Sequence, residues 1–302
     1  MNIDSIYKEL AQKIDNDRLI KDAAMKEYTS FKAGGNAALL AMPENIEQLS
    51  FALKILASTD IDYFIMGNGT NLLVRDRGYN GVIIRIADPF SNIKVSGDSL
   101  IAESGALLSS VANKACEHGL AGFEFASGIP GSLGGATFMN AGAYDGDMSK
   151  VVESVQVISK DGSKEYTLTN EEMQFGYRKS ILMTRGDIVA SVKIKLSYGD
   201  KKTISAKIEE LAKKRNEKQP LQYPSAGSFF KRPVGNYAGK LIQDANLKGL
   251  TVGGAKVSTL HAGFIINEGN ASATDIIDLM KLVQNIVYEN SGIMLEPEVR
   301  II

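Results

Sequence analysis

The stretch SGIPGSLGGATFMNAGAYDG, Ser127 to Gly146, holds six of the 29 glycines of this chain. Glycine reaches positive φ and lets another backbone or a ligand approach where any Cβ would clash. Successive free amide N–H groups can also form a concave anion site. The alternative interpretation is a set of tight turns between packed elements. The run therefore points to a flat cofactor that carries phosphates, with a cluster of structural turns as the competing possibility.

A second glycine-containing loop follows a predicted buried strand. The apolar run Ile61–Met66 is typical of such a strand, and GNGTNLLV, Gly67–Val74, comes directly after it. The loop begins like the dinucleotide-binding motif G-x-G-x-x-G, but Leu72 stands at the third glycine position, so that fingerprint is incomplete. The glycines and the side chains of Thr70 and Asn71 still offer several donors to a phosphate. Two such loops favour a diphosphate-containing cofactor more strongly than either does alone.

Length and composition describe a globular chain with no bias towards a polymer partner. Its 302 residues are 44% hydrophobic and exceed the usual size of a single core, so two or three lobes are expected. Lys plus Arg number 34 against 35 Asp plus Glu, without any long run of like charge, so neither nucleic acid nor membrane is expected as a partner. No stretch approaches the roughly 18 apolar residues of a membrane span, and the amino terminus lacks a signal core. We therefore expect a cytoplasmic protein. We also expect a monomer, although neither composition nor charge bears on the oligomeric state.

Several familiar catalytic motifs are absent or incomplete. The single Cys116 forbids an internal disulfide, and only His118 and His261 are available as imidazoles. A Cys/His metal site is therefore not expected, and a Ser–His triad would have little choice of base. The run Gly235–Lys240 resembles a P-loop, but its two glycines are one residue too close for that motif. We therefore interpret the run as the start of a helix.

Hydrophobic periodicity predicts alternating helices and strands along the first two thirds of the chain. The predicted elements are a helix over 45–59, strands at 61–66 and 81–86, a helix over 107–118 closed by Gly119, an Asp161-Gly162 hairpin, and a strand over 188–196. A composition change at Ser197–Asp200 marks a lobe boundary, and a lysine-rich helix follows as far as Pro220. Ser272–Asp275 resembles a capping box before a long helix that ends at Gly292. The final LEPEVRII, residues 295–302, is predicted to be a strand that returns to the earlier sheet.

Ordered motifs spread over nearly the whole chain resemble those of one enzyme family. They are TSFKAGGNA (29–37), GNGTNLLV (67–74), SGIPGSLGGATFMNAGAY (127–144), GYRKS (176–180), PSAGSFFKRP (224–233), GGAKVSTLHAGFIIN (253–267) and LEPEVR (295–300). The chain is similar to the UDP-N-acetylenolpyruvoylglucosamine reductases (UDP-N-acetylmuramate dehydrogenases), flavoenzymes of bacterial cell-wall synthesis. Its compact length resembles the shorter, type II form of that family.

The resemblance implies an α+β fold and an FAD-binding domain of the vanillyl-alcohol-oxidase type. The implied lobes are residues 1–75 for the first FAD-binding lobe, 76–198 with 293–302 for the second, and 199–292 for an α+β substrate-binding domain. Family members hold FAD without a covalent link. NADPH reduces the flavin and leaves, and the enolpyruvyl ether of UDP-N-acetylglucosamine then enters the same site and is reduced to UDP-N-acetylmuramate.

By their positions in the motifs, Arg178, Ser228 and Glu298 match the catalytic residues of that family. Hydride addition to the enolpyruvyl group leaves an enolate-like anion next to its carboxylate, and the planar guanidinium of Arg178 suits that charge. Glu298 must be protonated or held against Arg178, because a bare carboxylate would repel the anion, so we predict a raised pKa for Glu298. Ser228 is the predicted donor of the proton that the carbon receives last.

The resemblance also implies two sets of binding residues. The expected FAD-binding residues are Gly67, Asn68, Gly69, Thr70, Asn71, Leu72, Ser127, Gly128, Ile129, Pro130, Ser132, Gly135, Ala136, Asn140, Ala141, Gly142 and Arg300. The expected substrate-binding residues are Tyr177, Arg215, Lys218 and Lys231. Arg215 and Lys231 are also candidates for stabilising the Ser228 alkoxide. Arg232 and Gly263 depart from the family pattern, in which Asn is common at both positions, and this affects details of substrate contact rather than the reaction.

Plain structural roles and two other functions compete with this assignment. On sequence alone, Ser228 would be a capping hydroxyl in a turn-rich segment, and Arg178 and Glu298 would be surface charges or an ion pair. Tyr177 could pack in a core instead of lying near a flavin, and Lys218 could belong to a solvated helix face. An FAD-dependent oxidase of alcohols or hydroxy acids would need a His or Tyr base in place of Ser228 and Arg178. A non-catalytic nucleotide-sugar binder is the third possibility.

Overall fold

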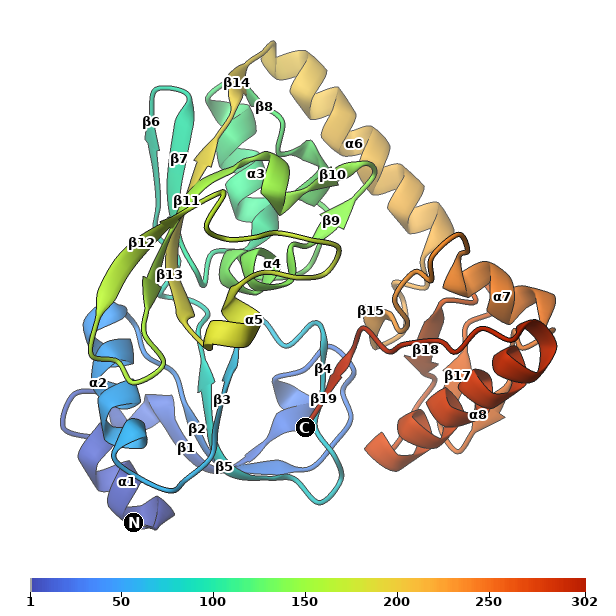
Figure 1. Cartoon of the computed structure of the whole chain (residues 1–302), viewed down its shortest axis with the longest axis horizontal. Helices are drawn as coiled ribbons and strands as arrows, with labels where there is room; N and C mark the ends of the chain where they lie inside the picture. Colours follow the sequence, from blue (N-terminus) through green and yellow to red (C-terminus); the bar gives the residue numbers. More distant parts are fainter. Residues whose placement is uncertain (1) are drawn as a thin grey trace. The chain divides into compact units, whose positions relative to one another are not determined.

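The computed structural model describes residues 2–302 as a mixture of helices and strands, which confirms the predicted α+β fold. Contacts within the chain divide it into two compact units. The first unit comprises the chain up to Lys21, Leu39–Asn68 and Gly81–Arg215, and the second comprises Asp22–Ala38, Gly69–Asn80 and Asn216–Ile302. Figure 1 labels the helices and strands that make up each unit.

A four-stranded sheet and two helices form the first core of unit one, in blue in Figure 1. The strand order is β1 (Leu19–Ala24), β2 (Asn36–Ala41), β5 (Tyr79–Arg85) and β3 (Tyr63–Met66). The helices α1 (Ile3–Leu10) and α2 (Ile46–Ala57) bury apolar side chains in the same core, and the short helix η1 (Asn16–Arg18) precedes β1. The predicted helix and both predicted strands are confirmed by α2, β3 and β5. The strands β3 and β5 pair in parallel, as expected for strands joined by a crossover.

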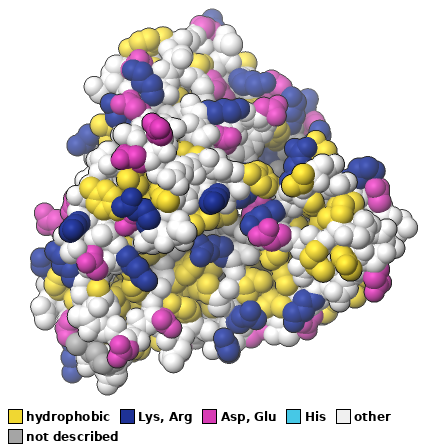
Figure 2. Space-filling view, viewed as in Figure 1, with side chains coloured by type: hydrophobic (Ala, Val, Ile, Leu, Met, Phe, Trp, Pro, Cys, Tyr) yellow, Lys and Arg dark blue, Asp and Glu magenta, His cyan; other side chains and the backbone are white. Residues whose placement is uncertain are grey.

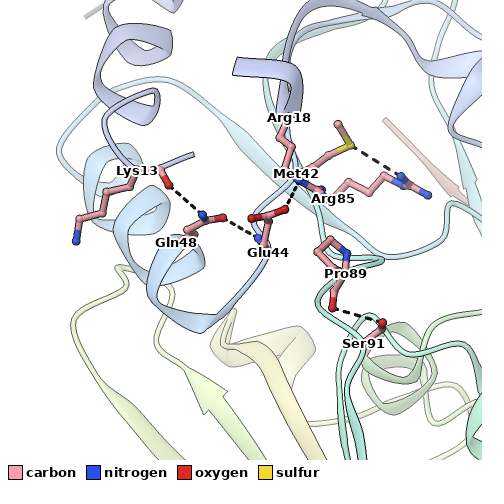
Figure 3. Close-up of polar contacts among 8 residues, drawn as sticks. All are labelled: Lys13, Arg18, Met42, Glu44, Gln48, Arg85, Pro89 and Ser91. Atoms are coloured by element: carbon pink, nitrogen blue, oxygen red, sulfur yellow. Dashed lines mark hydrogen bonds and ion pairs between the residues drawn. The ribbon is translucent and has the colours of Figure 1, made fainter. Parts of the chain in front are cut away.

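Hydrogen bonds at the start of α2 tie this helix to the preceding chain (Figure 3). The Gln48 side chain accepts from the Glu44 backbone N–H at 2.8 Å and donates to the Lys13 carbonyl oxygen at 2.9 Å. Arg18 Nε lies 2.5 Å from Glu44 Oε1 in an ion pair. The Asn45 side chain caps the helix by accepting from the Gln48 N–H at 3.0 Å. The helix therefore begins where the sequence predicts it.

A five-stranded antiparallel sheet forms the second core of unit one. Its order is β12 (Glu165–Thr169), β11 (Val152–Ile158), β13 (Ile188–Lys195), β7 (Ser99–Glu103) and β6 (Ile93–Ser96). The predicted hairpin is confirmed as β11–β12, with Gly162 at φ +71° in its turn. The helices α3 (Leu108–Glu117) and α4 (Leu133–Met139) bury apolar residues in this core. Since α4 lies inside the glycine-rich run, that run includes a helix which the sequence did not predict.

Short elements complete unit one. They are β8 (Leu120–Ala121), η3 (Glu124–Ala126), β9 (Gly142–Ala143), β10 (Gly146–Asp147), η4 (Met148–Lys150), α5 (Leu182–Arg185) and β14 (Ser197–Tyr198). The predicted lysine-rich helix is α6 (Lys201–Lys218), which continues along the chain from the first unit into the second. Ile204 and Leu211 are its buried residues, so its other faces carry solvated charge.

A four-stranded antiparallel sheet with two helices forms the core of unit two. The strand order is β15 (Ser225–Ser228), β18 (Phe264–Asn267), β17 (Ala255–Val257) and β16 (Thr251–Val252). The two helices are α7 (Ala238–Asp244) and α8 (Ala273–Ser291), and the short helix η2 (Met25–Glu27) also belongs to this unit. The predicted capping box is confirmed, because the Ser272 side chain accepts from the Asp275 N–H at 3.0 Å and the Asp275 side chain accepts from the Ser272 N–H. The helix ends at Gly292 with φ +69°, also as predicted.

The carboxyl-terminal strand does not return to either sheet of unit one. Instead, β19 (Arg300–Ile301) pairs in parallel with β4 (Leu72–Leu73), so that expectation is wrong. The reason is apolar packing: Phe31, Ala33 and Leu73 bury their side chains in the core of unit two, beside Val299.

The units also differ from the three expected lobes. Three apolar clusters exist, but the two in the amino-terminal two thirds belong to one unit. Residues 22–38 and 69–80 join the carboxyl-terminal unit.

The distribution of surface charge and the hydropathy of the helices agree with what the composition predicts. Figure 2 shows positive and negative side chains interspersed over the visible face of the molecule, in keeping with a net charge of −1. Within residues 2–302, no helix is both long and apolar enough to cross a membrane.

Candidate active site

The loop after β3 and the glycine-rich run meet within unit one. The Asn68 side chain donates to the Pro130 carbonyl oxygen at 2.9 Å. A Cβ added at Gly67 would lie 2.1 Å from Ser132 Oγ, so only glycine fits there without a shift of that side chain. The two loops predicted to hold one cofactor are therefore neighbours in space, at least in their Gly67–Asn68 and Pro130–Ser132 portions.

Packing explains three of the six glycines in the run. A Cβ at Gly134 would lie 2.7 Å from the Ser104 Cβ, and one at Gly142 would lie 2.5 Å from the Gly146 carbonyl oxygen. At Gly146 the same atom would lie 2.4 Å from the Phe125 ring. These glycines let α4 approach β7 and let the β9–β10 hairpin close. The interpretation as structural turns is thus correct for part of the run.

Gly135 differs from these three because it is exposed on the first turn of α4. Among residues 2–302, and apart from its chain neighbours and the backbone of α4, the only heavy atom within 4 Å of a Cβ built there is Ser132 Oγ at 3.4 Å, which is ordinary van der Waals contact. No packing reason within the protein requires glycine at this position. An uncrowded, glycine-bearing surface beside Ser132 and Gly67 fits a ligand that lies directly against the backbone.

Arg178 lies in a tight turn of unit one, between β12 and α5. Gly176 and Lys179 exchange backbone hydrogen bonds of 3.0 and 3.1 Å, and Tyr177 and Arg178 form the tip between them. Arg178 adopts φ +53°, a left-handed conformation that is uncommon for residues other than glycine. Such strain persists only where the surroundings hold it in place.

The Arg178 guanidinium faces the glycine-rich run. Its Nη2 donates to the Gly142 carbonyl oxygen at 3.3 Å, and its Cζ lies 5.1 Å from the Tyr177 ring centroid. Tyr177 is 56% exposed, so the interpretation of Tyr177 as a core residue is wrong. A cation over an aromatic face stabilises both side chains in this arrangement.

Arg215, near the end of α6, packs against the same run. A Cβ added at Gly128 would lie 3.1 Å from Arg215 Cδ. Burial lowers the pKa of the Arg215 guanidinium from its usual value, yet an arginine remains charged at neutral pH. The neighbouring Lys214 is instead paired with Glu210 at 2.5 Å. Arg215 is therefore a half-buried cation beside the glycine-rich run, as a site for a phosphate requires.

Ser228 and Glu298 come together in unit two. Ser228 ends β15, opposite Phe264 of β18, and its side chain is exposed. The backbone N–H of Glu298 donates to the carbonyl oxygen of Phe229, the residue after Ser228, at 2.8 Å. A bridge between Phe230 and Pro297 continues this pairing. Two of the three predicted catalytic residues therefore lie on adjacent backbone segments, although 70 positions separate them in the sequence.

Lys231 lies beside the Glu298 segment, whereas Lys218 lies on a solvated helix face, one of the two positions considered for it. The Lys231 ammonium pairs with the Glu296 carboxylate, and its backbone N–H donates to the Glu296 carbonyl oxygen at 2.8 Å. Lys231 thus fastens the Ser228 segment to the Glu298 segment. Lys218 is exposed at the end of α6.

The loop after β3 also holds the Glu298 segment, through its second half. The Asn71 side chain donates to the Glu298 carbonyl oxygen at 3.1 Å, and the Arg300 N–H donates to the Asn71 carbonyl oxygen at 3.1 Å. Asn71 and Arg300, both expected at the cofactor, are therefore joined to each other through the backbone.

Sequence reasoning missed Ser30 in this part of the molecule. Its hydroxyl donates to the Ser225 carbonyl oxygen at 2.7 Å, and its backbone N–H donates to the Gly69 carbonyl oxygen at 3.1 Å. Ser30 thereby links the glycine loop to the strand that carries Ser228. The only signal in the sequence was the position of Ser30 within the motif TSFKAGGNA.

Comparison with known proteins supplies the class of this site. Residues 37–165 match a family model described as "FAD binding domain". The 4-ethylphenol oxidase of Gulosibacter chungangensis shares the fold at a TM-score of 0.50 and 14% identity, over 65% of this chain and 42% of that one. The chain is therefore an FAD-dependent oxidoreductase.

Its particular family follows from matches over the full length. Residues 219–302 match the model "UDP-N-acetylenolpyruvoylglucosamine reductase, C-terminal domain". The chain is 49% identical to the UDP-N-acetylenolpyruvoylglucosamine reductase of Alkaliphilus oremlandii, over 98% of this chain and 97% of the relative. A crystal structure of that reductase from Thermus caldophilus matches with a TM-score of 0.80 and 37% identity, covering 94% of this chain and 97% of the other. The chain belongs to the UDP-N-acetylenolpyruvoylglucosamine reductase family.

Proposed function

We propose that the protein reduces the enolpyruvyl ether of UDP-N-acetylglucosamine to UDP-N-acetylmuramate, a step in peptidoglycan precursor synthesis, with NADPH as the source of the hydride. The observation that carries this proposal is the pairing of the Ser228 and Glu298 segments through the Glu298 N–H and the Phe229 carbonyl oxygen. An FAD-binding fold alone gives no reason for these two motif residues to lie on paired backbone segments. Near-full-length identity of 49% to a reductase named for this substrate supports it.

The residues present suit FAD. The exposed Gly135 and the close approach of Gly67 to Ser132 offer a backbone surface for a diphosphate-containing cofactor. The remaining expected cofactor residues lie on the same two loops, with Arg300 on the strand paired to one of them. When bound, FAD would pass a hydride from NADPH to the substrate.

Arg178 would bind the substrate carboxylate and the negative charge that develops beside it. Its guanidinium is a planar fork that fits a carboxylate with two hydrogen bonds. Held by its turn and by the Gly142 carbonyl oxygen, it would be oriented before the charge forms, which is the arrangement that lowers a barrier most. Tyr177 would cover one face of this group.

Ser228 would donate the final proton from its Oγ to the carbon next to the carboxylate. An exposed hydroxyl at the end of a strand can reach a ligand without rearrangement of the backbone. Glu298, protonated in the free enzyme, would hydrogen-bond to the developing anion rather than repel it. Arg215 and Lys218 would bind the substrate diphosphate, while Lys231 would keep the Ser228 and Glu298 segments together.

The function is tested with the purified, FAD-loaded protein under anaerobic conditions. Addition of NADPH is expected to bleach the flavin absorbance, and subsequent addition of the enolpyruvyl nucleotide sugar is expected to restore it with formation of UDP-N-acetylmuramate. An FAD that stays oxidised with NADPH, but is bleached by an alcohol or a hydroxy acid, would identify an oxidase instead. A protein without flavin that still binds the nucleotide sugar would be a non-catalytic binder.

A further inference from the structure

Asn140 occupies a buried position directly after α4, where its conformation and its hydrogen bonds are both unusual. Its side chain is 5% exposed, and its backbone adopts the left-handed conformation with φ +44°. The side-chain oxygen accepts from the Ser149 N–H at 2.9 Å, and the side-chain nitrogen donates to the Gly176 carbonyl oxygen at 2.9 Å. Both ends of one buried amide therefore hold backbone groups that are distant in the sequence.

The second of these groups belongs to the turn that presents Arg178. Gly176 is the first residue of the turn, and Ser180, one residue past its end, is fully buried with its hydroxyl donating to the Phe138 carbonyl oxygen at 2.7 Å. The end of α4 thus anchors the Arg178 turn on both sides. Because Arg178 itself has φ +53°, the turn would relax to other conformations without such anchors.

Asparagine suits position 140 for two separate reasons. Among residues other than glycine, it is one of the few that adopt the left-handed conformation readily. Its amide also offers a donor and an acceptor at the same time, which neither aspartate nor leucine does. If position 140 only had to end the helix, glycine would serve equally well. The hydrogen bonds to Ser149 and Gly176 require the amide side chain.

We propose that Asn140 is a positioning residue that fixes the Arg178 guanidinium through the Gly176–Lys179 turn. This inference rests on the proposed function, because it takes Arg178 as the group that meets the substrate carboxylate. Asn140 was expected at the cofactor, but its amide is buried and bonded to Ser149 and Gly176, so we assign it to the turn instead. Its effect would pass through the backbone of the turn. The end of α4 would thereby tie the Arg178 turn to the glycine-rich run expected at the cofactor.

The test uses the FAD-loaded enzyme with Asn140→Gly and Asn140→Asp. Glycine keeps the left-handed backbone and removes both side-chain bonds, whereas aspartate keeps the acceptor for Ser149 and removes the donor to Gly176. Both variants lose the hydrogen bond to Gly176, so both should lower kcat for the nucleotide sugar about tenfold or more, with KM for NADPH and the rate of flavin bleaching unchanged. Hydrogen exchange of the 176–180 amides should quicken by about the same factor.

Asn170→Ala is the matched control. The Asn170 amide also holds two backbone carbonyl groups, those of Ser149 and Val152 at 2.8 and 2.6 Å, but it makes no hydrogen bond to the Arg178 turn. Its variant should leave kcat and the exchange of the 176–180 amides unchanged. If the control lost as much kcat as the Asn140 variants, the cause would be a general loss of local stability, and the proposal would be overturned.

A double-mutant cycle with Arg178→Ala distinguishes the positioning role of Asn140 from the proposed role of Arg178. If Asn140 acts through Arg178, then Asn140→Gly should cost less than twofold in kcat once the guanidinium is gone. Equal losses in both backgrounds would overturn the positioning role and leave the proposed function intact. Full turnover by Arg178→Ala alone would refute the role of Arg178, and with it both this inference and that part of the proposed function.

Discussion

The backbone N–H of Glu298 donates to the carbonyl oxygen of Phe229 at 2.8 Å. This one bond, in unit two, places the residue after Ser228 against the backbone segment that carries Glu298. Backbone pairing fixes distance and direction more tightly than a contact between long side chains does, since each extra rotatable bond adds conformational entropy. Ser228 and Glu298 are thus held by main chain, and the Ser228 side chain is exposed.

Replacement of Ser228 by alanine should separate the two halves of the reaction. Loss of the hydroxyl should lower turnover of the nucleotide sugar by roughly 10²- to 10⁴-fold, the usual contribution of a positioned proton donor. Bleaching of the flavin by NADPH should continue at the wild-type rate, as followed by stopped-flow absorbance. Ser225→Ala, on the same strand, is the control and should turn over normally. Normal turnover by Ser228→Ala would remove Ser228 from the role of proton donor.

Two glycines of the glycine-rich run should respond differently to substitution. Gly135→Leu adds a side chain on an exposed face of α4, so the free energy of unfolding should change by only about 0.5 kcal/mol while FAD is lost. Gly142→Ala drives a Cβ against the Gly146 carbonyl oxygen, so it should destabilise the protein by about 1–3 kcal/mol. Flavin absorbance and denaturant unfolding, measured on the same samples, distinguish the two effects. A Gly135→Leu protein that keeps full flavin would contradict the proposal that FAD lies against the backbone beside Gly135.

Asp76 should stabilise unit two through the start of α8. Its carboxylate accepts from the Ala273 and Thr274 backbone N–H groups at 2.8 and 2.7 Å and from the Thr274 hydroxyl at 2.6 Å. Asp76→Ala should therefore cost about 1–3 kcal/mol in urea unfolding. Asp278→Ala, on the same helix in an exposed ion pair with Lys281, is the control and should cost less than about 1 kcal/mol. Equal costs for the two variants would contradict the capping role.

The same carboxylate predicts a dependence on pH. Burial raises the pKa of Asp76, but the three hydrogen bonds outweigh that effect, and the net result is a pKa below the ordinary 3.8. The stabilisation is therefore complete above that ordinary value and is lost as the pH falls through the folded-state pKa. Urea titrations at pH 6 and at pH 3 should show a difference between wild type and Asp76→Ala that shrinks at the lower pH. A difference that persists unchanged would indicate that the charge does not matter.

His261 should make the protein less stable in mild acid. Burial is the main cause that lowers its pKa from 6.5, and its Nδ1 accepts from the Gly263 N–H at 3.1 Å. Below pH 6.5 the unfolded chain binds a proton that the folded chain does not, so stability falls as the pH drops from 6.5 to the folded-state pKa. His261→Asn removes the imidazole and should flatten this part of the stability profile between pH 7 and 5.5. An unchanged slope in that variant would assign the effect to another group.

Local sequence was sufficient for several elements of the fold. The Ser272–Asp275 capping box and Gly292 mark α8 at both ends, and the Asp161-Gly162 pair marks the β11–β12 hairpin. In each case the deciding interactions lie within a few residues of one another. The family could likewise be inferred, because its motifs are contiguous runs that keep their order along the chain.

Longer-range relationships could not be predicted in this way. The partner of the carboxyl-terminal strand was predicted wrongly, because pairing of Arg300 with Leu72 depends on how distant apolar side chains share one core. The sequence also could not show why each glycine is needed. A Cβ at Gly142 would clash with the Gly146 carbonyl oxygen, whereas a Cβ at Gly135 would meet no such obstacle. The raised pKa predicted for Glu298 stays a prediction.

The sequence by itself therefore determined the longer helices α2, α3, α6 and α8, the β11–β12 hairpin, the FAD-dependent class and the family, since each of these is encoded in short runs of residues. Only the tertiary structure decided which residues hold the active-site groups: Asn140 for the Arg178 turn, Lys231 and Phe229 for the Ser228 and Glu298 segments, and Asn71 for Glu298. The physical reason is that hydrogen bonds and packing act over a few ångströms in space. Residues far apart in the chain become partners only after the cores bring their backbones together.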